Sequence, residues 1–421
     1  MKNLSELATI ASQRTVAMTK TRHHRSSIFR IHHRLAVALT AVIVLAPAFL
    51  GVRSAHGQTA KNSKETTLYT FTGGADGASP YASLIRDANG NLYGATFAGG
   101  AANLGTVFKV DKTGKETVLY SFTGPPDGEH PSDRLLRDKA GNFYGPLYEG
   151  GASGYGAVFK LDTTGKESLV YSFGPGTDGE YPGGGLIEDA VGNFYGTTGY
   201  GGASGNGTVY KLSKSGKETV LHSFTGADGQ YPFSTLLRDS AGTLYGTTSM
   251  GGTSGNGTVF KLTKKRKESV LHSFAGGTDG VNPYAGLVQD VKENFYGTTY
   301  SGGAGCQGFG CGTVFKLDPK GKETVLHAFA TADGHYPDFG TLVRDAAGNL
   351  YGTTYAGGTA DLGTVFKVSS SGKESVLYSF TGGTDQGFPV AGLIQDKAGN
   401  FYGTTLGNPP TTYGTVFKLA P

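Results

Sequence analysis

The sequence of 421 residues lacks tryptophan and contains only three methionines and two cysteines. The absence of Trp argues against repeats of the WD40 and kelch kinds, whose signatures carry one. Seventy glycines argue against a helical protein, because Gly costs roughly 1 kcal/mol per helix position relative to Ala. Hydrophobic residues make up 37% of the chain, with 24 Phe and 23 Tyr, which suffices for a core and excludes a disordered or collagen-like chain. The composition therefore predicts a turn-rich β protein.

Excess positive charge is confined to the first 57 residues. The formal net charge is +4, but residues 1–57 hold eight basic residues and one acidic residue, which leaves a net charge of −3 in residues 58–421. A nucleic-acid-binding protein would need a basic patch on its folded body. We therefore expect no nucleic-acid partner.

Residues 1–57 have the features of an export signal. A basic, His-containing stretch precedes the apolar run 35–50, and the small residues Ala55 and Gly57 fit a signal-peptidase cleavage rule. Sixteen residues interrupted by a proline are marginal for a membrane span. The segment predicts a cleaved signal peptide, or else a retained N-terminal anchor, followed by a short linker over 58–64. We expect a secreted or cell-surface protein that touches a membrane only through this segment, if it is uncleaved.

A unit of about 51 residues recurs seven times between residues 65 and 421. It is marked by a Tyr-Gly pair at intervals of 50 to 55 residues, with the tyrosines Tyr93, Tyr144, Tyr195, Tyr245, Tyr296, Tyr351 and Tyr402. An aromatic residue in a G-[TA]-V-[FY]-K cluster follows each Tyr by 15 residues, except in the fifth copy, where the spacing is 19. Self-similarity at such a period indicates a repeat architecture.

Each unit is predicted to form four short strands. In the first copy these are 84–87, 91–96, 106–110 and 116–122, bounded by turns rich in Gly, Asn and Asp. Both alternating faces of the third strand are apolar, so it needs cover on both sides, as blades stacked face to face provide. A four-stranded unit of this length, present seven times, predicts an all-β, seven-bladed β-propeller over 65–421.

The phase of the repeat predicts how the ring closes. The first copy begins with a fourth strand, 65–71, and the chain ends just after a third strand, 414–419. The last blade therefore lacks one strand, and the N-terminal part of the propeller has one to spare. Pairing the two completes the last blade and removes two exposed edges.

The repeated motifs resemble those of a known family. The segments G-K-E-T-V-L-Y-S-F-T-G, L-I-x-D-x-x-G-N-x-Y-G-T-T and G-T-V-F-K-L recur at fixed offsets along 65–421. This pattern resembles the bacterial GloVer (Gloeo-Verruco) tandem repeat. The resemblance implies an exported or surface-attached repeat protein without an established activity, and it carries over no catalytic residue. The chain departs from the pattern at Pro146-Leu147 and at Gly407-Asn408-Pro409-Pro410.

Residues present in every copy are expected to build blades. The Asp before each first turn, such as Asp87, is expected to bond turn amides. Gly94 and its equivalents are expected to permit aromatic packing between blades. The Asp of each inter-blade Asp-Gly loop, such as Asp76, offers one carboxylate, whereas Ca²⁺ takes six to eight oxygens, so turn chemistry is favoured over calcium binding.

Positions that vary between copies are the better functional candidates. They lie before each loop proline and after each second strand, and loops of both kinds should share one face of the ring. The predicted ligand-binding residues are His130, Tyr148, Tyr181, Tyr231, Tyr300, Tyr336, Tyr355 and Phe388. Aromatic rings suit glycan stacking or protein hot spots, and ordinary loop packing is the alternative interpretation.

Histidine and cysteine offer little further chemistry. His222, His272 and His327 replace a Tyr of the other copies, but they should lie in three different blades, whereas zinc ligands must all lie about 2 Å from one ion. We therefore expect no metal site, and the Gly-rich loops lack the context of nucleotide binding, so we expect no cofactor. Cys306 and Cys311 fall in the insertion of the fifth copy and, in an exported chain, predict a local disulfide.

Together these features predict a monomeric binding module for an extracellular polysaccharide or an envelope protein. No G-x-S-x-G, H-E-x-x-H, Walker A or C-x-x-C-H motif is present. The alternative is a propeller-type glycan hydrolase or lyase that uses carboxylates at the channel mouth, such as Glu129, Glu180 or Glu188. Glu188 stands where other copies carry Arg or Gln, and a surface charge exchange also explains it.

Overall fold

The computed structural model describes residues 63–421 except Gln307 and Asp338. The predicted leader, 1–57, lies outside the described residues, as does most of the predicted linker, 58–64. Within the described part, no helix is long and apolar enough to cross a membrane.

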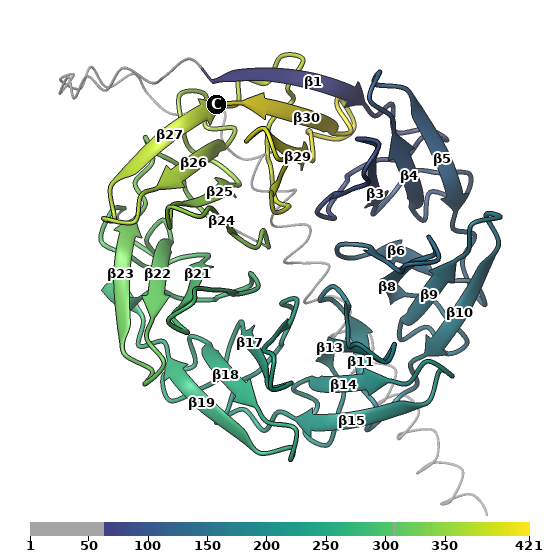
Figure 1. Cartoon of the computed structure of the whole chain (residues 1–421), viewed down its shortest axis with the longest axis horizontal. Coiled ribbons are helices and arrows are strands. Elements are labelled where there is room, and N and C mark those ends of the chain that lie inside the picture. Colours follow the sequence, from purple (N-terminus) through teal and green to yellow (C-terminus); the bar gives the residue numbers. More distant parts are fainter. Residues whose placement is uncertain (1–62, 307, 338) are drawn as a thin grey trace, which may run out of the picture. The chain divides into compact units, whose positions relative to one another are not determined.

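The described chain is a ring of seven β-sheets (Figure 1). Contacts divide the whole chain into two units, Met1–Gln58 and Thr59–Pro421, and the second unit forms this ring. Each sheet is an antiparallel meander whose first strand lies nearest the centre of the ring and whose fourth strand lies at the outer edge. The seven-bladed β-propeller expected from the repeat is confirmed.

The blades are numbered in chain order, and their strands run from the channel outward. They are β2 (Ile85–Arg86), β3 (Leu92–Thr96), β4 (Thr106–Val110) and β5 (Glu116–Ser121); β7 (Leu136–Arg137), β8 (Phe143–Glu149), β9 (Ala157–Leu161) and β10 (Glu167–Ser172); β12 (Ile187–Glu188), β13 (Phe194–Tyr200), β14 (Thr208–Leu212) and β15 (Glu218–Ser223); β16 (Leu237–Arg238), β17 (Leu244–Thr248), β18 (Thr258–Leu262) and β19 (Glu268–Ser273); β20 (Val288–Gln289), β21 (Phe295–Thr299), β22 (Thr313–Leu317) and β23 (Glu323–Ala328); β24 (Val343–Arg344), β25 (Leu350–Thr354), β26 (Thr364–Val368) and β27 (Glu374–Ser379); and β28 (Ile394–Gln395), β29 (Phe401–Thr405), β30 (Thr415–Ala420) and β1 (Lys64–Thr70). The innermost strands are shorter than the sequence suggested.

The third strand of each blade is buried on both faces, as its apolar pattern predicts. In β4, Val107 and Phe108 are both fully buried. Phe108 covers Gly94 on the adjacent strand, and a Cβ on Gly94 would lie 2.7 Å from its ring. The glycine of the Tyr-Gly pair therefore makes room for an aromatic residue of its own blade. The expectation that this glycine serves packing between blades was wrong, because its direct cross-strand partner is in the same sheet.

Packing between blades uses a second repeated aromatic residue. The Phe after each fourth strand meets the third-strand aromatic of the next blade edge to face, at centroid distances of 4.9 to 5.3 Å, in the pairs Phe71–Phe108, Phe122–Phe159, Phe173–Tyr210, Phe224–Phe260, Phe274–Phe315, Phe329–Phe366 and Phe380–Phe417. Such pairs contribute about 0.5–1.5 kcal/mol each beyond the area they bury. The core is thus a set of layers between neighbouring blades.

The ring closes by pairing of the two ends of the propeller. Strand β1 is antiparallel to β30, with Thr66 opposite Lys418 and Thr67 opposite Phe417. The last blade therefore consists of three strands from the end of the chain and one from residues 64–70. This is the closure expected from the phase of the repeat.

Two further strands lie outside the four-strand pattern. β6 (Glu129–Pro131) and β11 (Glu180–Pro182) pair with the ends of β8 and β13, which are seven residues long rather than five. In four other blades the equivalent pairing is an isolated bridge, such as Ala78 to Ala98. These strands were not predicted, because each contains a proline and is only three residues long.

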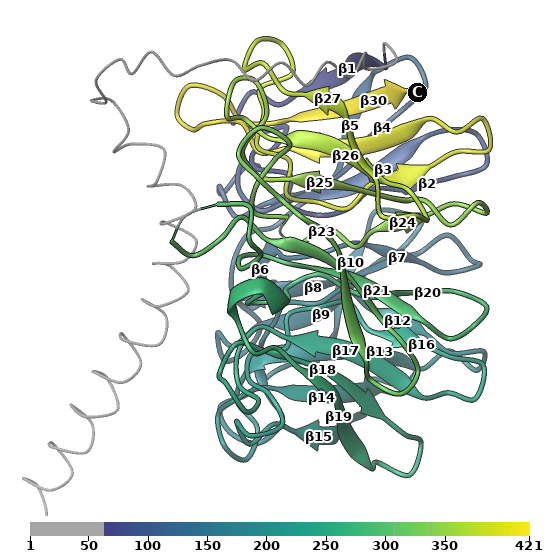
Figure 2. The same cartoon turned by 90° about the vertical axis from the view of Figure 1, so that its left-hand side faces the viewer.

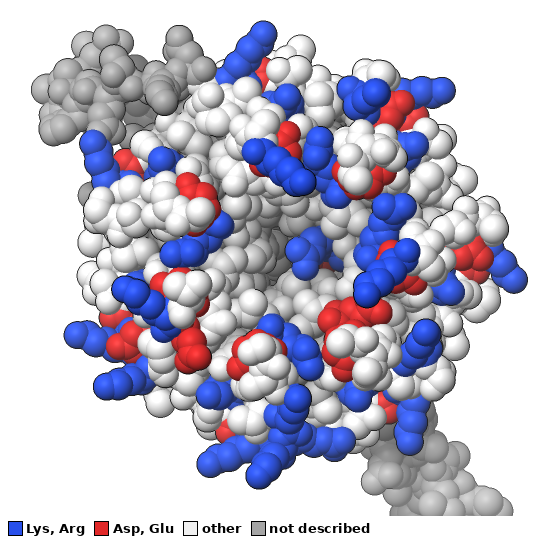
Figure 3. Space-filling model, viewed as in Figure 1, with Lys and Arg blue, Asp and Glu red and all other residues white. Residues whose placement is uncertain are grey.

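The meander places its connections at two opposite faces. Turns between the first and second strands and between the third and fourth strands form what we call the turn face. The remaining loops, within and between blades, form the loop face. In Figure 2, β7, β12 and β16 lie towards one side of the ring, and β6 and the 3-10 helix η2 (Gly277–Asp279) lie at the other. Figure 3 shows the turn face, where basic and acidic side chains are interspersed around a hollow centre.

Candidate functional site on the loop face

The residue before each loop proline has a left-handed backbone. The φ angles lie between +53° and +60° at Ser79, His130, Tyr181, Tyr231, Asn282, Tyr336 and Phe388. Tyr231 donates its N–H to the carbonyl of Asn206 in the preceding blade (2.9 Å), and its own carbonyl accepts the N–H of Ser249 in its own blade (3.2 Å). Non-glycine residues keep such a conformation only where their surroundings hold it. These bonds therefore fix the direction in which the side chain leaves the blade boundary.

The side chain at this position packs against a residue of the preceding blade. Phe97 stacks on His130, with centroids 4.4 Å apart and an interplanar angle of 14°. Tyr300 stacks on Tyr336 at 4.7 Å and 12°. More tilted pairs, at 4.9 to 5.2 Å, are Tyr148–Tyr181, Tyr200–Tyr231 and Tyr355–Phe388. Each of the eight predicted ligand-binding residues thus belongs to one of five pairs at blade boundaries, with Phe97 and Tyr200 as the other two members. Their binding of a ligand remains a prediction.

Tyr200 was missed in the sequence analysis. By the spacing of the repeat, Gly199 is the residue equivalent to Tyr148 and Tyr300. Strand β13 extends to Tyr200, and the ring of Phe233 occupies the space beside Gly199. Tyr200 therefore contacts Tyr231 in place of the residue expected there.

The candidate rings differ in burial. Tyr148 is 5% exposed and Phe388 is 6% exposed. Phe388 lies in an apolar cluster with Val390 and Leu406, so its ring supports the loop face from below. His130, Tyr231 and Tyr336 are only partly buried. Ligand contact is therefore expected first at the partly buried rings.

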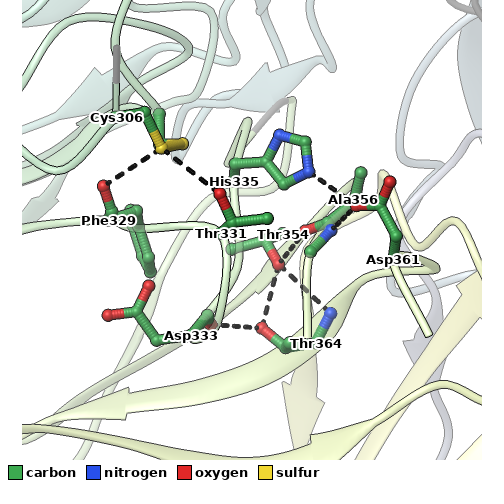
Figure 4. Close-up of polar contacts among 11 residues, drawn as sticks. Cys306, Phe329, Thr331, Asp333, His335, Thr354, Ala356, Asp361 and Thr364 are labelled. Atoms are coloured by element: carbon green, nitrogen blue, oxygen red, sulfur yellow. Dashed lines mark hydrogen bonds and ion pairs between the residues drawn. A yellow bond between two sulfur atoms is a disulfide. The ribbon is translucent and has the colours of Figure 1, made fainter. Parts of the chain in front are cut away.

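The insertion of the fifth blade adds an exposed aromatic residue that the sequence analysis did not select. Cys306 and Cys311 form the expected disulfide, with Cα atoms 5.5 Å apart. The N–H of Gly302 donates to the carbonyl of Phe309 (2.7 Å), and the N–H of Tyr336 donates to that of Cys311 (2.9 Å). The Phe309 side chain is 90% exposed. The disulfide loop therefore presents Phe309 to solvent, and its Cys311 carbonyl holds the backbone of Tyr336. Figure 4 shows Cys306 of this loop next to Thr331.

The proposed channel-mouth carboxylates are not one cluster. Glu180 is opposite Tyr200 at the end of β13, whereas Glu188 is opposite Phe194 at its start. Six residues of extended strand separate these positions by about 20 Å. Glu188 therefore lies at the turn face, and the expectation that it shares the channel mouth with Glu129 and Glu180 was wrong. Paired carboxylates in glycosidases lie within about 10 Å of each other.

Comparison with known families identifies the repeat. The family described as the Gloeobacter/Verrucomicrobia repeat matches residues 58–249 and 215–417. The chain belongs to this family. A comparison with curated proteins found no match.

Solved structures similar to this Gloeobacter/Verrucomicrobia repeat protein share its fold at low identity. Two are extracellular domains of BT4673 from B. thetaiotaomicron, described as a putative one-component and a putative hybrid two-component system. Their TM-scores are both 0.56, at 9% and 10% identity, over 85% and 84% of this chain and 40% and 39% of theirs. This chain thus spans about two-fifths of their length. A gluconolactonase from Xanthomonas campestris matches with a TM-score of 0.42 and 14% identity, over 86% of this chain and 90% of its own.

The first repeated carboxylate of the Gloeobacter/Verrucomicrobia repeat organises a turn in this chain, as expected. Asp87 accepts the N–H groups of Asn89 and Asn91, each at 2.9 Å, and the hydroxyl of Tyr93 at 3.0 Å. Burial acts to raise the pKa of Asp87, but these hydrogen bonds outweigh it and hold the pKa below its usual value.

The second repeated carboxylate joins each inter-blade loop to the outer strand before it. Asp76 accepts the N–H of Thr72 (2.8 Å) and the hydroxyl of Tyr69 (2.9 Å). In three blades a histidine replaces the tyrosine, and its Nε2 lies 2.9 to 3.1 Å from the loop Asp, in the pairs His222–Asp228, His272–Asp279 and His327–Asp333. The three histidines lie on β15, β19 and β23, so each belongs to a different blade.

Proposed function

We propose that this chain is an exported binding module that holds a polysaccharide on its loop face by stacking sugar rings on aromatic side chains. The observation that carries the proposal is the set of aromatic pairs at the blade boundaries, held by left-handed residues before the loop prolines. Rings fixed before binding lose little conformational freedom when a ligand arrives. The flat, uncharged faces of aromatic rings suit the apolar faces of sugars.

Two observations support a location outside the cytoplasm. The Cys306–Cys311 disulfide is of a kind that persists in oxidising compartments. Residues 1–57 carry the sequence features of an export signal. The similar solved structures described as extracellular domains are compatible with this location, although at their identity they show the fold alone.

Variation between copies favours binding over a role in the scaffold. The residues that build turns and inter-blade packing recur in nearly every blade, whereas the boundary pairs range from Phe97–His130 to the non-aromatic Ser249–Asn282. A single elongated ligand makes different contacts with each blade, so it needs different residues around the ring. Phe309, present in one blade alone, adds to this asymmetry.

Binding of immobilised polysaccharides by the purified chain tests the proposal. Tyr231→Ala, Tyr336→Ala and Phe309→Ala should each weaken binding several-fold, since one aromatic contact contributes about 0.5–1.5 kcal/mol. Lys265→Ala, an exposed residue between β18 and β19 on the turn face, is the control and should bind as the unaltered chain does.

Three outcomes would contradict the proposal. Undiminished binding in all three aromatic variants would show that the loop face is not the binding site. Saturable binding to an envelope protein, with no binding to any polysaccharide, would show that the ligand is a protein rather than a polysaccharide. Release of shortened oligosaccharides during incubation would favour the glycan hydrolase or lyase instead.

A further inference from the structure

A second repeated arrangement lies at the outer edge of the propeller, away from the loop-face rings. At each blade boundary the loop Asp faces a Glu that begins the outer strand of the following blade, in the pairs Asp76–Glu116, Asp127–Glu167, Asp178–Glu218, Asp228–Glu268, Asp279–Glu323, Asp333–Glu374 and Asp385–Glu65. The third member, from the preceding blade, is Tyr at four boundaries and His at three. The same framework thus exists in a tyrosine form and a histidine form.

At two of the histidine boundaries the three side chains converge closely. The ligand atoms of His222, Asp228 and Glu268 all lie within 4.8 Å of one another, and so do those of His327, Asp333 and Glu374. The distance from His Nε2 to Asp Oδ2 is 2.9 Å in the first group and 3.1 Å in the second. Each group draws one side chain from each of two blades and one from the loop that joins them.

The carboxylates in these groups have atoms available for a ligand. Asp228 Oδ1 accepts the N–H of Thr225 (2.8 Å), and Asp333 Oδ1 accepts the N–H of Ala330 (2.7 Å), so in each case Oδ2 is the oxygen turned to the histidine. Figure 4 shows the Asp333 carboxylate directed away from Thr354 and Thr364. The Oε1 atoms of Glu268 and Glu374 are buried and have no hydrogen-bond partner among the described residues.

We propose that these two boundaries, His222–Asp228–Glu268 and His327–Asp333–Glu374, each bind one divalent transition-metal ion of the Zn²⁺ class. One imidazole nitrogen and two carboxylate oxygens are a ligand set that Zn²⁺ accepts, with water completing the coordination. The amide bonds to the Asp Oδ1 atoms orient the ligating carboxylates, as outer-shell contacts do in metal sites. A bound ion would join consecutive blades at the outer edge.

The electrostatics of the groups supports a cation at this place. In each group a carboxylate oxygen of the Asp and one of the Glu lie within 4.8 Å of each other and of a nitrogen of the His. Two facing carboxylates therefore carry a repulsion that a cation would relieve. Tyrosine at the equivalent position donates its hydroxyl to the Asp and, with its pKa raised by burial, stays neutral and ligates poorly.

The remaining histidine boundary differs from these two. Asp279 turns both of its oxygens to His272, at 3.1 and 3.3 Å. Among the described residues, convergence of the ligand atoms within 4.8 Å is found for the His222 and His327 groups and not for this one. This boundary is therefore outside the proposal and serves as its control.

Metal stoichiometry of the full chain tests the proposal. After chelator treatment, reloading with Zn²⁺ should restore two ions per chain at these sites, and Co²⁺ should give the visible absorption of a low-coordinate complex. His222→Tyr and His327→Tyr should each remove one ion, because they reproduce the residue found at four other boundaries and keep a donor to the Asp. His272→Tyr should bind as the unaltered chain does. The double variant also measures any background from the histidines of residues 1–57, which all variants share.

The result is decisive in either direction. Stoichiometry that His222→Tyr and His327→Tyr leave unchanged would overturn the proposal, as would a lack of any Zn²⁺ beyond the background of the double variant. Glu268→Gln and Glu374→Gln provide a second readout and should each weaken binding at their own boundary by about tenfold or more. The outcome is independent of polysaccharide binding, since all these residues lie at the outer edge.

Discussion

The ring of Tyr300 stacks on the ring of Tyr336 at a centroid distance of 4.7 Å, although the two residues belong to consecutive blades. The contact exists because Tyr336 has φ +60° and donates its N–H to Cys311 of the preceding blade. Surface chemistry on the loop face is therefore a property of blade boundaries rather than of single repeats.

Removal of β1, residues 64–70, should abolish cooperative unfolding. The strand completes the last blade, and its loss exposes the edge of β30 and opens the ring. Differential scanning calorimetry would show a broad or absent transition. Removal of residues 59–63, which precede the strand, is the control and should leave the transition in place. A sharp transition at the original temperature without β1 would show that the ring does not depend on this closure.

Gly403→Ala should destabilise the propeller by about 1–3 kcal/mol, the usual effect of overpacking. The added Cβ would lie 2.7 Å from the ring of Phe417 and 3.0 Å from Leu393. Gly383→Ala, in the loop that leads into the same blade, is the control, because its nearest neighbour would be 3.6 Å away, and it should change stability by less than about 0.5 kcal/mol. Equal effects in denaturant unfolding would refute the role assigned to the Tyr-Gly glycine.

Stability should increase as the pH falls from about 8 to about 5. Burial, and then the facing aspartates, raise the pKa of Glu116, Glu167 and Glu218 from 4.5 to about 7. The folded chain therefore binds more protons than the unfolded chain between these values, so the stabilisation is full below pH 4.5 and is lost as the pH rises through 7. Thermal melts between pH 8 and pH 5 measure this change in stability.

The triple variant Glu116→Gln, Glu167→Gln and Glu218→Gln is the test of that assignment. All three residues belong to tyrosine boundaries, where we propose no metal ion. The variant should melt at a higher temperature than the unaltered chain at pH 8 and show a flatter pH profile. A profile as steep as that of the unaltered chain would mean that other groups control it. Toward pH 2, protonation of Asp189 and Asp290, whose pKa values are about 2, should destabilise both proteins.

The double variant Cys306→Ser and Cys311→Ser should keep the fold. The disulfide closes a short loop, so its contribution to the free energy of unfolding is about 2 kcal/mol or less. Limited proteolysis should show faster cleavage near Phe309, and polysaccharide binding should fall because the loop that presents this ring is no longer fixed by the disulfide. Loss of cooperative unfolding would instead assign the bridge a role in the whole ring.

The architecture was predictable because it depends on short-range patterns. Alternating apolar residues, Gly-Asn turns and a constant period specify an antiparallel meander within each unit, and the phase of the repeat specifies its closure. The third strand, 106–110, was predicted to the residue, since the requirement for cover on both faces is visible in its side chains. The disulfide was predictable for the same reason, as both cysteines lie in one loop.

Contacts between blades were less accessible from the sequence. The pairing of Tyr200 with Tyr231 depends on the extension of β13, and the position of Glu188 depends on which end of that strand it faces. Asp228, in the loop between two blades, faces Glu268, which lies 40 positions later in the outer strand of the following blade. The residue pattern within one repeat unit gives no information about contacts between residues so far apart in the chain.

The sequence by itself determined the number of blades, their strand order and the way the ring closes, because hydrogen bonding in a meander connects residues close in the chain. The tertiary structure alone decided which side chains meet across each boundary, because that depends on how one blade is rotated against the next. The candidate binding surface and the proposed metal sites both lie at these boundaries. They are products of the assembled ring.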